Sequence, residues 1–227
     1  MAYRQAAYGA LTNRQAVDPA AYRQALDALR PPSSRRRAKS AVVPVRDAVY
    51  QVKITLHGTK PPIWRRLRLP ASTTLAQLHQ IIQVGFAWED AHLHAFEVDG
   101  RRYSRPDFEL WDEAADEGGA RLRDLAARPG TRLRYTYDFG DSWEHDVLVE
   151  KILPSDGVAQ AVCLTGRRAG PPEDWGGVWG LAELCDILAD PDHPDHAERV
   201  DWLGRPYDPA AFDKDAVNAS LGRIRLG

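Results

Sequence analysis

The sequence predicts an α+β protein whose mostly antiparallel sheet opens with a β-hairpin and a helix, a β-grasp-like start, and whose C-terminal part is helical. Apolar and polar residues alternate over 49–57 and again over 63–69, as in two half-buried strands. A helix should follow, because apolar or small residues then recur at helical spacing: Leu75, Leu78, Ile81, Ile82 and Gly85. The helical pattern returns after residue 177.

The composition is that of a globular protein with one substantial core. Of 227 residues, 44% are hydrophobic and 27% are charged, which excludes wholesale disorder. No apolar run reaches membrane-spanning length and the N-terminus lacks the apolar block of a signal peptide, so we expect a cytoplasmic protein without a membrane partner. Cys163 and Cys185 are too few for a disulfide framework or a four-cysteine zinc site.

The charge is distributed unevenly along the chain. Residues 1–46 contain nine Arg or Lys and two Asp, whereas the rest contains 21 basic and 30 acidic residues. A short helix is predicted over 19–30, between Asp18 and Pro31. We therefore predict a basic, partly helical N-terminal extension and linker over 1–46, and a single α+β domain over 47–227.

Two basic stretches are candidate contacts for nucleic acid. They comprise Arg35, Arg36, Arg37 and Lys39 in the linker, and Trp64, Arg65 and Arg66 in the second predicted strand. Clustered arginines release counterions when they bind phosphates, and a tryptophan can stack on a base. The alternatives are a solubilising tether for the linker, and for the strand the charged outer face of a sheet edge, which discourages aggregation.

A second hairpin is predicted around residues 132–150. A three-residue loop, 140–142, would place Tyr137 opposite His145 and Tyr135 opposite Val147, which gives the hairpin one continuous apolar face. The same register places Arg132 opposite Glu150. It also places Asp138 opposite Glu144, and two like charges repel unless water screens them or a cation lies between them.

Two sets of side chains are candidate metal ligands: Asp138, Asp141 and Glu144 around the hairpin loop, or His92, His94 and His145. Two histidines at i and i+2 of a strand project the same way, and a zinc site needs a third ligand. The structural alternatives are a solvated hairpin end and hydrogen-bonded core histidines. The sequence identifies no cofactor. The cofactor that these residues would bind is a divalent metal ion.

Two segments lack a clear pattern. We expect an exposed loop over 104–120, and a long loop over 154–180 that is functional, mobile or packed on the sheet as a cover through Trp175 and Trp179. Three helices should follow at 178–189, 194–203 and 213–225.

Five ordered motifs resemble the plasmid pRiA Orf-three-like domain family over about 49–225: Lys60–Leu67, Leu75–His79, Trp88–Phe96, Tyr137–His145 and Pro171–Gly177. The resemblance implies an α+β domain of bacteria, archaea and mobile elements, without an established activity. Some members are labelled resolvase-like passengers of insertion elements, but this sequence has no matching nucleophilic serine set among arginines. The family often carries cysteines where this chain has Gly170 and Trp175, so we expect no thiolate zinc site.

Two functions remain open, and the sequence does not decide whether the protein is an enzyme. The favoured interpretation is a non-enzymatic binding module whose acidic and aromatic face engages a protein or small ligand, with the basic arm adding nucleic-acid affinity. The alternative is a metal-dependent hydrolase acting on phosphoesters, in which Glu173 or Asp174 orients or deprotonates water. The binding module is favoured because the family resemblance implies no set of catalytic residues.

Overall fold

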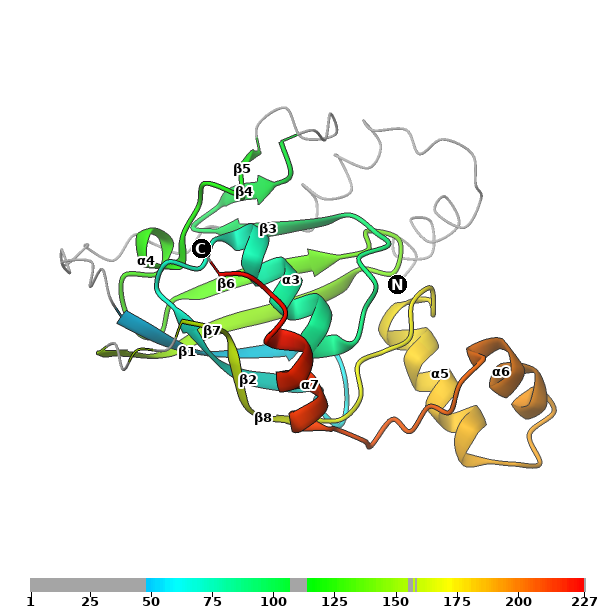
Figure 1. The fold of residues 1–227 in the computed structure, drawn as a ribbon. Helices are drawn as coiled ribbons and strands as arrows, with labels where there is room; N and C mark the ends of the chain where they lie inside the picture. The colour runs from blue at the N-terminus through cyan, green and yellow to red at the C-terminus, as the bar shows by residue number, and fades with distance from the viewer. Residues whose placement is uncertain (1–47, 107–113, 155–156, 158, 227) are drawn as a thin grey trace. The chain divides into compact units, whose positions relative to one another are not determined.

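The structure, a computed structural model, describes residues 48–106, 114–154, 157 and 159–226, all within one compact unit, Val42–Gly227. The expected helix over 19–30 and the basic linker lie outside these residues. The strands are β1 Ala48–Leu56, β2 Trp64–Pro70, β3 His94–Val98, β4 Arg101–Ser104, β5 Ala115–Asp116, β6 Arg132–Tyr137, β7 Trp143–Pro154 and β8 Val162–Arg167. The helices are α3 Leu75–Phe86, α4 Leu122–Leu125, α5 Gly177–Ala189, α6 His196–Leu203 and α7 Lys214–Leu221 (Figure 1).

Within the described residues the strands form one sheet of eight, in the order β5-β4-β3-β6-β7-β1-β2-β8. Among the strands of the described residues, only β4 and β5 pair in parallel. The predicted α+β class, with a mostly antiparallel sheet and a helical C-terminal part, is confirmed. The β-grasp-like detail is not confirmed: β1, β2 and α3 occur in the expected order, but β1 has β2 and β7 as neighbours, and the strand after the helix lies between β4 and β6.

Helix α3 covers one face of the sheet, and α7 packs beside it against β8 (Figure 1). The alternation predicted for β1 is confirmed, because its core-facing residues are buried: Tyr50, Val52, Ile54 and Leu56. Thr74 begins α3 with a capping box, in which its hydroxyl accepts from the Gln77 N–H and the Gln77 side chain accepts from the Thr74 N–H. The buried stripe of α3 and the inner face of the sheet therefore form one core.

The second hairpin has the predicted apolar face but not the predicted register. Tyr135 pairs with His145 and Tyr137 with Trp143, a shift of two residues from the expected pairing. Because side chains alternate with a period of two, this shift leaves the same residues buried and changes only their partners. Arg132 therefore lies opposite Leu148, and Glu144 opposite Thr136.

The register differs because the hairpin loop is longer than expected. Asp138 has a left-handed backbone, with φ of 50°, and does not belong to a strand. Its carboxylate accepts from the N–H groups of Gly140 and Asp141, and its carbonyl accepts from the N–H of Ser142. These bonds stabilise a five-residue loop over 138–142, so the predicted opposition of Asp138 and Glu144 is wrong.

Strand β2 is not at the edge of the sheet, because β8 pairs with its outer side. The sequence interpretation of 154–180 as a long loop missed β8. The outer face of β2 still carries charge, since Arg66 makes two bonds of 2.7 and 2.8 Å to the carboxylate of Glu150, the residue predicted to pair with Arg132. The charge of Arg66 on β2 therefore pairs with another side chain, and it does not protect an open sheet edge.

The remaining elements depart from prediction in their bounds or burial. Helices α6 and α7 are shorter than the predicted 194–203 and 213–225. The expected exposed loop over 104–120 contains β5 and the buried Glu117. Trp179 does not cover the sheet, since its side chain is 77% exposed. In the described part of the chain, no helix has the length and apolar character needed to cross a membrane.

Candidate functional site

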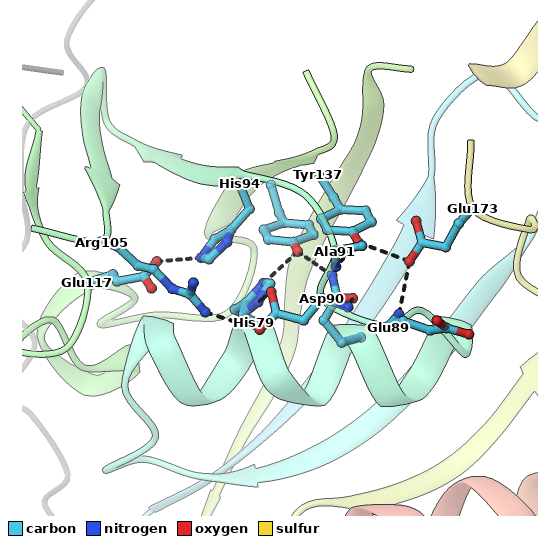
Figure 2. Close-up of polar contacts among 11 residues, drawn as sticks. His79, Glu89, Asp90, Ala91, His94, Arg105, Glu117, Tyr137 and Glu173 are labelled. Atoms are coloured by element: carbon cyan, nitrogen blue, oxygen red, sulfur yellow. Dashed lines mark hydrogen bonds and ion pairs between the residues drawn. The ribbon is translucent and has the colours of Figure 1, made fainter. Parts of the chain in front are cut away.

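The segment between α3 and β3 connects the second hairpin with the loop before α5. Trp88 donates its indole N–H to the carbonyl of Pro171 at 2.9 Å, and the backbone N–H of Glu89 donates to Oε1 of Glu173 at 2.9 Å. The backbone N–H of Ala91 donates to the hydroxyl of Tyr137 at 3.0 Å. Figure 2 shows the contacts of Glu89 and Ala91 with Glu173 and Tyr137, and beside them His79 and His94. The segment therefore holds two polar clusters side by side.

The first cluster, the His92 site, consists of His92, Asp138, Glu173 and Asp174. Nε2 of His92 lies 3.0 Å from Oδ1 of Asp174, 3.7 Å from Oδ2 of Asp138 and 3.8 Å from Oε2 of Glu173. The four residues come from three segments: the residues just before β3, the hairpin loop and the loop before α5. One imidazole nitrogen thus faces three carboxylates.

The Nε2–Oδ1 distance from His92 to Asp174 is that of two ligands of one ion, and the distances to Asp138 and Glu173 are slightly longer. Two atoms that each lie about 2.1 Å from a metal, at an angle of 90–110°, are about 3.0–3.5 Å apart. Atoms of His92, Asp138 and Asp174 all lie within 4.8 Å of one another. Nε2 of His92 and Oε2 of Glu173 are both inaccessible to solvent, and neither has a hydrogen-bond partner among the described residues. The contact with Asp174 at 3.0 Å is therefore a close approach of two charged or polar groups and not a hydrogen bond of good geometry.

Backbone conformation fixes two of the carboxylates. Asp138 and Asp174 have φ of 50° and 57°, in the left-handed region that aspartate tolerates better than most residues. The loop bonds occupy Oδ1 of Asp138, so that Oδ2 is the oxygen facing His92. Asp141, in the same loop, instead accepts from the N–H of Gly176 at 2.9 Å, before α5. Burial, and then the charge of Asp138, raises the pKa of Asp141.

Glu173 is held by one oxygen. Its Oε1 accepts from the hydroxyl of Tyr137 at 3.0 Å and from the Glu89 N–H, whereas Oε2 faces His92. Burial, and then the bond to Glu173, raises the pKa of Tyr137, so the phenol keeps its proton and remains the donor. A carboxylate with one oxygen fixed and the other unengaged by protein donors is suited to accepting a proton.

The second cluster is a buried histidine pair, His79 and His94. Their rings stack with centroids 3.5 Å apart and planes 5° from parallel. Nε2 of His79 lies 2.8 Å from Oδ1 of Asp90, and Nε2 of His94 lies 2.8 Å from Oε2 of Glu117. Figure 2 shows each imidazole with its carboxylate partner. His79, together with Glu117, borders a cavity of about 230 Å³.

Hydrogen bonding assigns a neutral form to His79. Gln83 donates its amide to the hydroxyl of Tyr135 at 3.2 Å, so the phenolic proton is available for Nδ1 of His79, 2.8 Å away. Nε2 then carries the proton that is donated to Asp90. Burial, followed by the proximity of His94, lowers the pKa of His79 to about 4, which agrees with this tautomer.

His79, Asp90 and His94 also have ligand atoms within 4.8 Å of one another, but their geometry does not suit a shared ion. A metal binds imidazole in the plane of the ring, about 2.0–2.1 Å from nitrogen. No point lies in both planes of two parallel rings 3.5 Å apart. The buried histidine pair is better explained as a satisfied polar network that orders the segment before β3.

The structure divides both predicted ligand sets. His92 lies in the His92 site and His94 in the buried pair, while His145 packs against Phe86 and Trp88, with Nδ1 3.0 Å from the carbonyl of Trp143. Of the acidic set, Asp138 is in the site, Asp141 caps the start of α5 and Glu144 lies on β7 opposite Thr136. The predicted catalytic candidates, Glu173 and Asp174, both lie beside His92.

One predicted nucleic-acid contact is ruled out by burial. Arg65 is 2% exposed and donates to the carbonyl oxygens of Gly85 and Arg167, between the rings of Phe86 and Phe212. A guanidinium enclosed in this way cannot reach a phosphate. Trp64 lies on the other face of β2, where Arg66 is 5.3 Å from its ring centroid.

Sequence reasoning missed the polar residues that support the clusters. No role is predicted for Asp90 or Glu117, and Tyr135 and Tyr137 are predicted only as part of the apolar face of the hairpin. Asp90 carried a usable signal, because it lies in the motif Trp88–Phe96 directly after a helix. Glu117 carried none, since its neighbours Asp116 and Gly118 are exposed.

Comparison with known proteins places the chain in a family. A solved structure from Methanosarcina mazei Go1, the protein of unknown function MM3350, is 39% identical with a TM-score of 0.67, and the match covers 74% of this chain and 97% of that one. The uncharacterised protein y4hQ of Sinorhizobium fredii is 35% identical over 176 residues, 77% of this chain and 91% of the relative. The family model described as plasmid pRiA4b ORF-3-like protein matches residues 48–216. The chain therefore belongs to the plasmid pRiA4b ORF-3-like protein family.

Proposed function

We propose that the protein binds a divalent metal ion through His92, Asp138 and Asp174 and acts as a metal-dependent hydrolase of phosphoesters. The observation that carries the proposal is the convergence of three carboxylates, at 3.0–3.8 Å, on Nε2 of His92, which has no hydrogen-bond partner among the described residues. A binding module was favoured on sequence alone because no constellation was visible. The His92 site forms only when three segments that are distant in the sequence come together in the fold. For this reason we now favour the hydrolase over the binding module.

The ligand set indicates the class of ion. One imidazole and two carboxylates suit zinc, manganese or iron, and three protein ligands leave positions for water and substrate. Asp174 has a side chain that is 66% exposed, so the site is open to solvent on one side. Such an ion would lower the pKa of bound water and polarise a phosphoryl oxygen.

Glu173 is the proposed general base. Its Oε2 is 3.8 Å from Nε2 of His92 and would accept a proton from water bound in the site. The oxygen of that water would form a bond to phosphorus while the bond from phosphorus to the ester oxygen breaks, and solvent would protonate the leaving alcohol. Tyr137 would keep Glu173 oriented through its bond to Oε1.

Manganese binding tests the ligand assignment. Titration of the full chain with Mn²⁺, followed by electron paramagnetic resonance, should show a site whose affinity falls at least about tenfold in His92→Gln and in Asp174→Asn. Asp99→Asn is a matched control, because Asp99 is also exposed with a left-handed backbone, φ of 51°. Unchanged affinity in both ligand variants would refute the assignment.

Hydrolysis of bis(p-nitrophenyl) phosphate tests the reaction separately. The wild type should hydrolyse it in the presence of Mn²⁺, and Glu173→Gln should lower the rate about 10²- to 10⁴-fold while Mn²⁺ still binds. Retention of the wild-type rate would remove Glu173 from the mechanism. Binding of Mn²⁺ without hydrolysis of this or another phosphodiester would leave a metal-binding module and contradict the enzyme.

A nucleic-acid partner stays a prediction. Four of its candidate contacts, Arg35, Arg36, Arg37 and Lys39, lie outside the described residues. Trp64 and Arg66 remain candidates on the outer face of β2, where Glu150 already pairs with Arg66. A cytoplasmic location and an association with mobile elements also remain predictions, the latter resting on the family resemblance alone.

A further inference from the structure

Helices α5 and α6 expose large apolar side chains. Trp179 on α5 is 77% exposed, and Val200 and Trp202 on α6 are 47% and 55% exposed. Helix α6 packs against α5 and has no buried residue. Tryptophan is costly to leave in water and is enriched where proteins bind partners, so this grouping indicates an interaction surface. We call these three residues together with Trp175 the α5–α6 surface.

Two of the tryptophans form an aromatic corner. The rings of Trp175 and Trp202 have centroids 4.4 Å apart and planes at 77°, an edge-to-face contact between the loop before α5 and α6. Trp202 remains more than half exposed despite this contact. A ligand group that enters the corner would therefore meet the faces or edges of two indoles.

The segment that carries these rings is strongly acidic, although Arg168 lies beside Cys185 of α5 and Arg205 follows α6. Residues 173–203 contain nine Asp or Glu and one Arg. The single cation, Arg199, lies 3.5 Å from Glu198, whose side chain is 73% exposed. Most of the carboxylates are exposed to solvent: Asp174, Glu183, Asp186, Asp190, Asp192, Glu198 and Asp201. Such a surface repels phosphates and attracts cations.

We propose that the α5–α6 surface binds an arginine-rich segment of a partner protein. A guanidinium group is planar, stacks on indole faces and pairs with carboxylates through two parallel bonds, so it matches both features of the surface. Lysine offers a point charge without the stacking plane. A nucleic acid would be repelled by the exposed carboxylates, and a second copy of this chain would bring a surface of the same charge. The proposal does not depend on the metal site.

Peptide binding by the full chain tests the proposal. A short fluorescein-labelled peptide of alternating arginine and leucine should bind in buffer that contains a chelator, as measured by fluorescence anisotropy, and more weakly at high salt. Trp202→Ala and Trp179→Ala should each raise Kd at least about tenfold, because exposed aromatic anchors dominate such interfaces. Asp201→Asn should raise Kd by about two- to fivefold, the smaller effect of one exposed charge.

The controls separate this surface from nonspecific attraction to an acidic protein. Leu164→Ala, at an exposed leucine of β8, and Asp99→Asn should leave Kd unchanged. A lysine and leucine peptide should bind more weakly than the arginine peptide. Wild-type affinity in both tryptophan variants would overturn the proposal, as would equal affinity for the two peptides. A dimer seen by sedimentation that Trp202→Ala abolishes would assign the surface to a second copy and overturn it too.

Because both tryptophans are exposed, their replacement should leave thermal unfolding close to that of the wild type. The chelator removes any contribution of a bound metal. A failure of peptide binding would therefore bear on the α5–α6 surface alone, and a failure of Mn²⁺ binding on the His92 site alone.

Discussion

Arg65→Met should lower the free energy of unfolding by about 3–5 kcal/mol, because the guanidinium is a buried cation that satisfies buried backbone groups. It donates to the carbonyl oxygens of Gly85 at 2.5 Å and Arg167 at 3.0 Å, and it lies between Phe86 and Phe212. Methionine keeps an apolar stem of similar length but leaves these carbonyls without that donor. Urea unfolding followed by tryptophan fluorescence measures the change.

The neighbouring arginine provides a matched control. Arg66 points to the other face of β2, where its side chain is 31% exposed and pairs with Glu150. Arg66→Met should cost only about 1 kcal/mol, as for a partly exposed ion pair. Equal losses in the two variants would contradict the assignment of Arg65 as a structural cation of the core.

Lowering the pH from 7 to 5 should reduce the free energy of unfolding by about 4 kcal/mol through two buried histidines. Burial lowers the pKa of His79 to about 4 and that of His145 to about 3, compared with about 6.5 in an unfolded chain. Between pH 6.5 and 4 the unfolded chain therefore binds protons that the folded chain does not. The contribution of the two histidines to the free energy of unfolding is fully present above pH 6.5 and is lost as the pH falls toward their folded-state pKa values.

The contribution of one histidine can be measured by comparing how the free energy of unfolding changes with pH in the wild type and in variants. His145→Phe removes one titrating ring from the aromatic cluster around Phe86 and Trp88, so the loss between pH 7 and 5 should shrink by about half, whatever the variant costs at pH 7. His57→Gln, at an exposed histidine, should keep the wild-type slope. A slope unchanged by His145→Phe would show that this ring titrates normally in the folded protein.

Local patterns were enough to predict much of the fold. The alternation over 49–57 marks β1, and the helical spacing of apolar residues from Leu75 onward marks α3, because each signal depends only on residues close in sequence. The register of the second hairpin could not be obtained in this way. It depends on Asp138, whose side chain and left-handed backbone lengthen the loop, and a shift of two residues preserves the same apolar face.

The candidate site was less accessible to prediction for a related reason. His92 and His94 were expected to share a strand face, but β3 begins at His94, so His92 is free of the alternation and turns to the hairpin loop. Asp174 approaches His92 from a loop 82 residues farther along the chain. The residue pattern of one segment carries no information about its contacts with distant segments. Glu173 and Asp174 could therefore be proposed as candidates, but their position beside His92 could not be predicted.

The central claim is that His92, Asp138 and Asp174 bind one divalent ion. Crystals of the full chain grown with Mn²⁺ and measured at the manganese absorption edge test it most directly. We expect an anomalous peak about 2.0–2.3 Å from Nε2 of His92 and within the same distance of carboxylate oxygens of Asp138 and Asp174. A peak located elsewhere, with ordered water or a plain hydrogen bond at Nε2 of His92, would contradict the account.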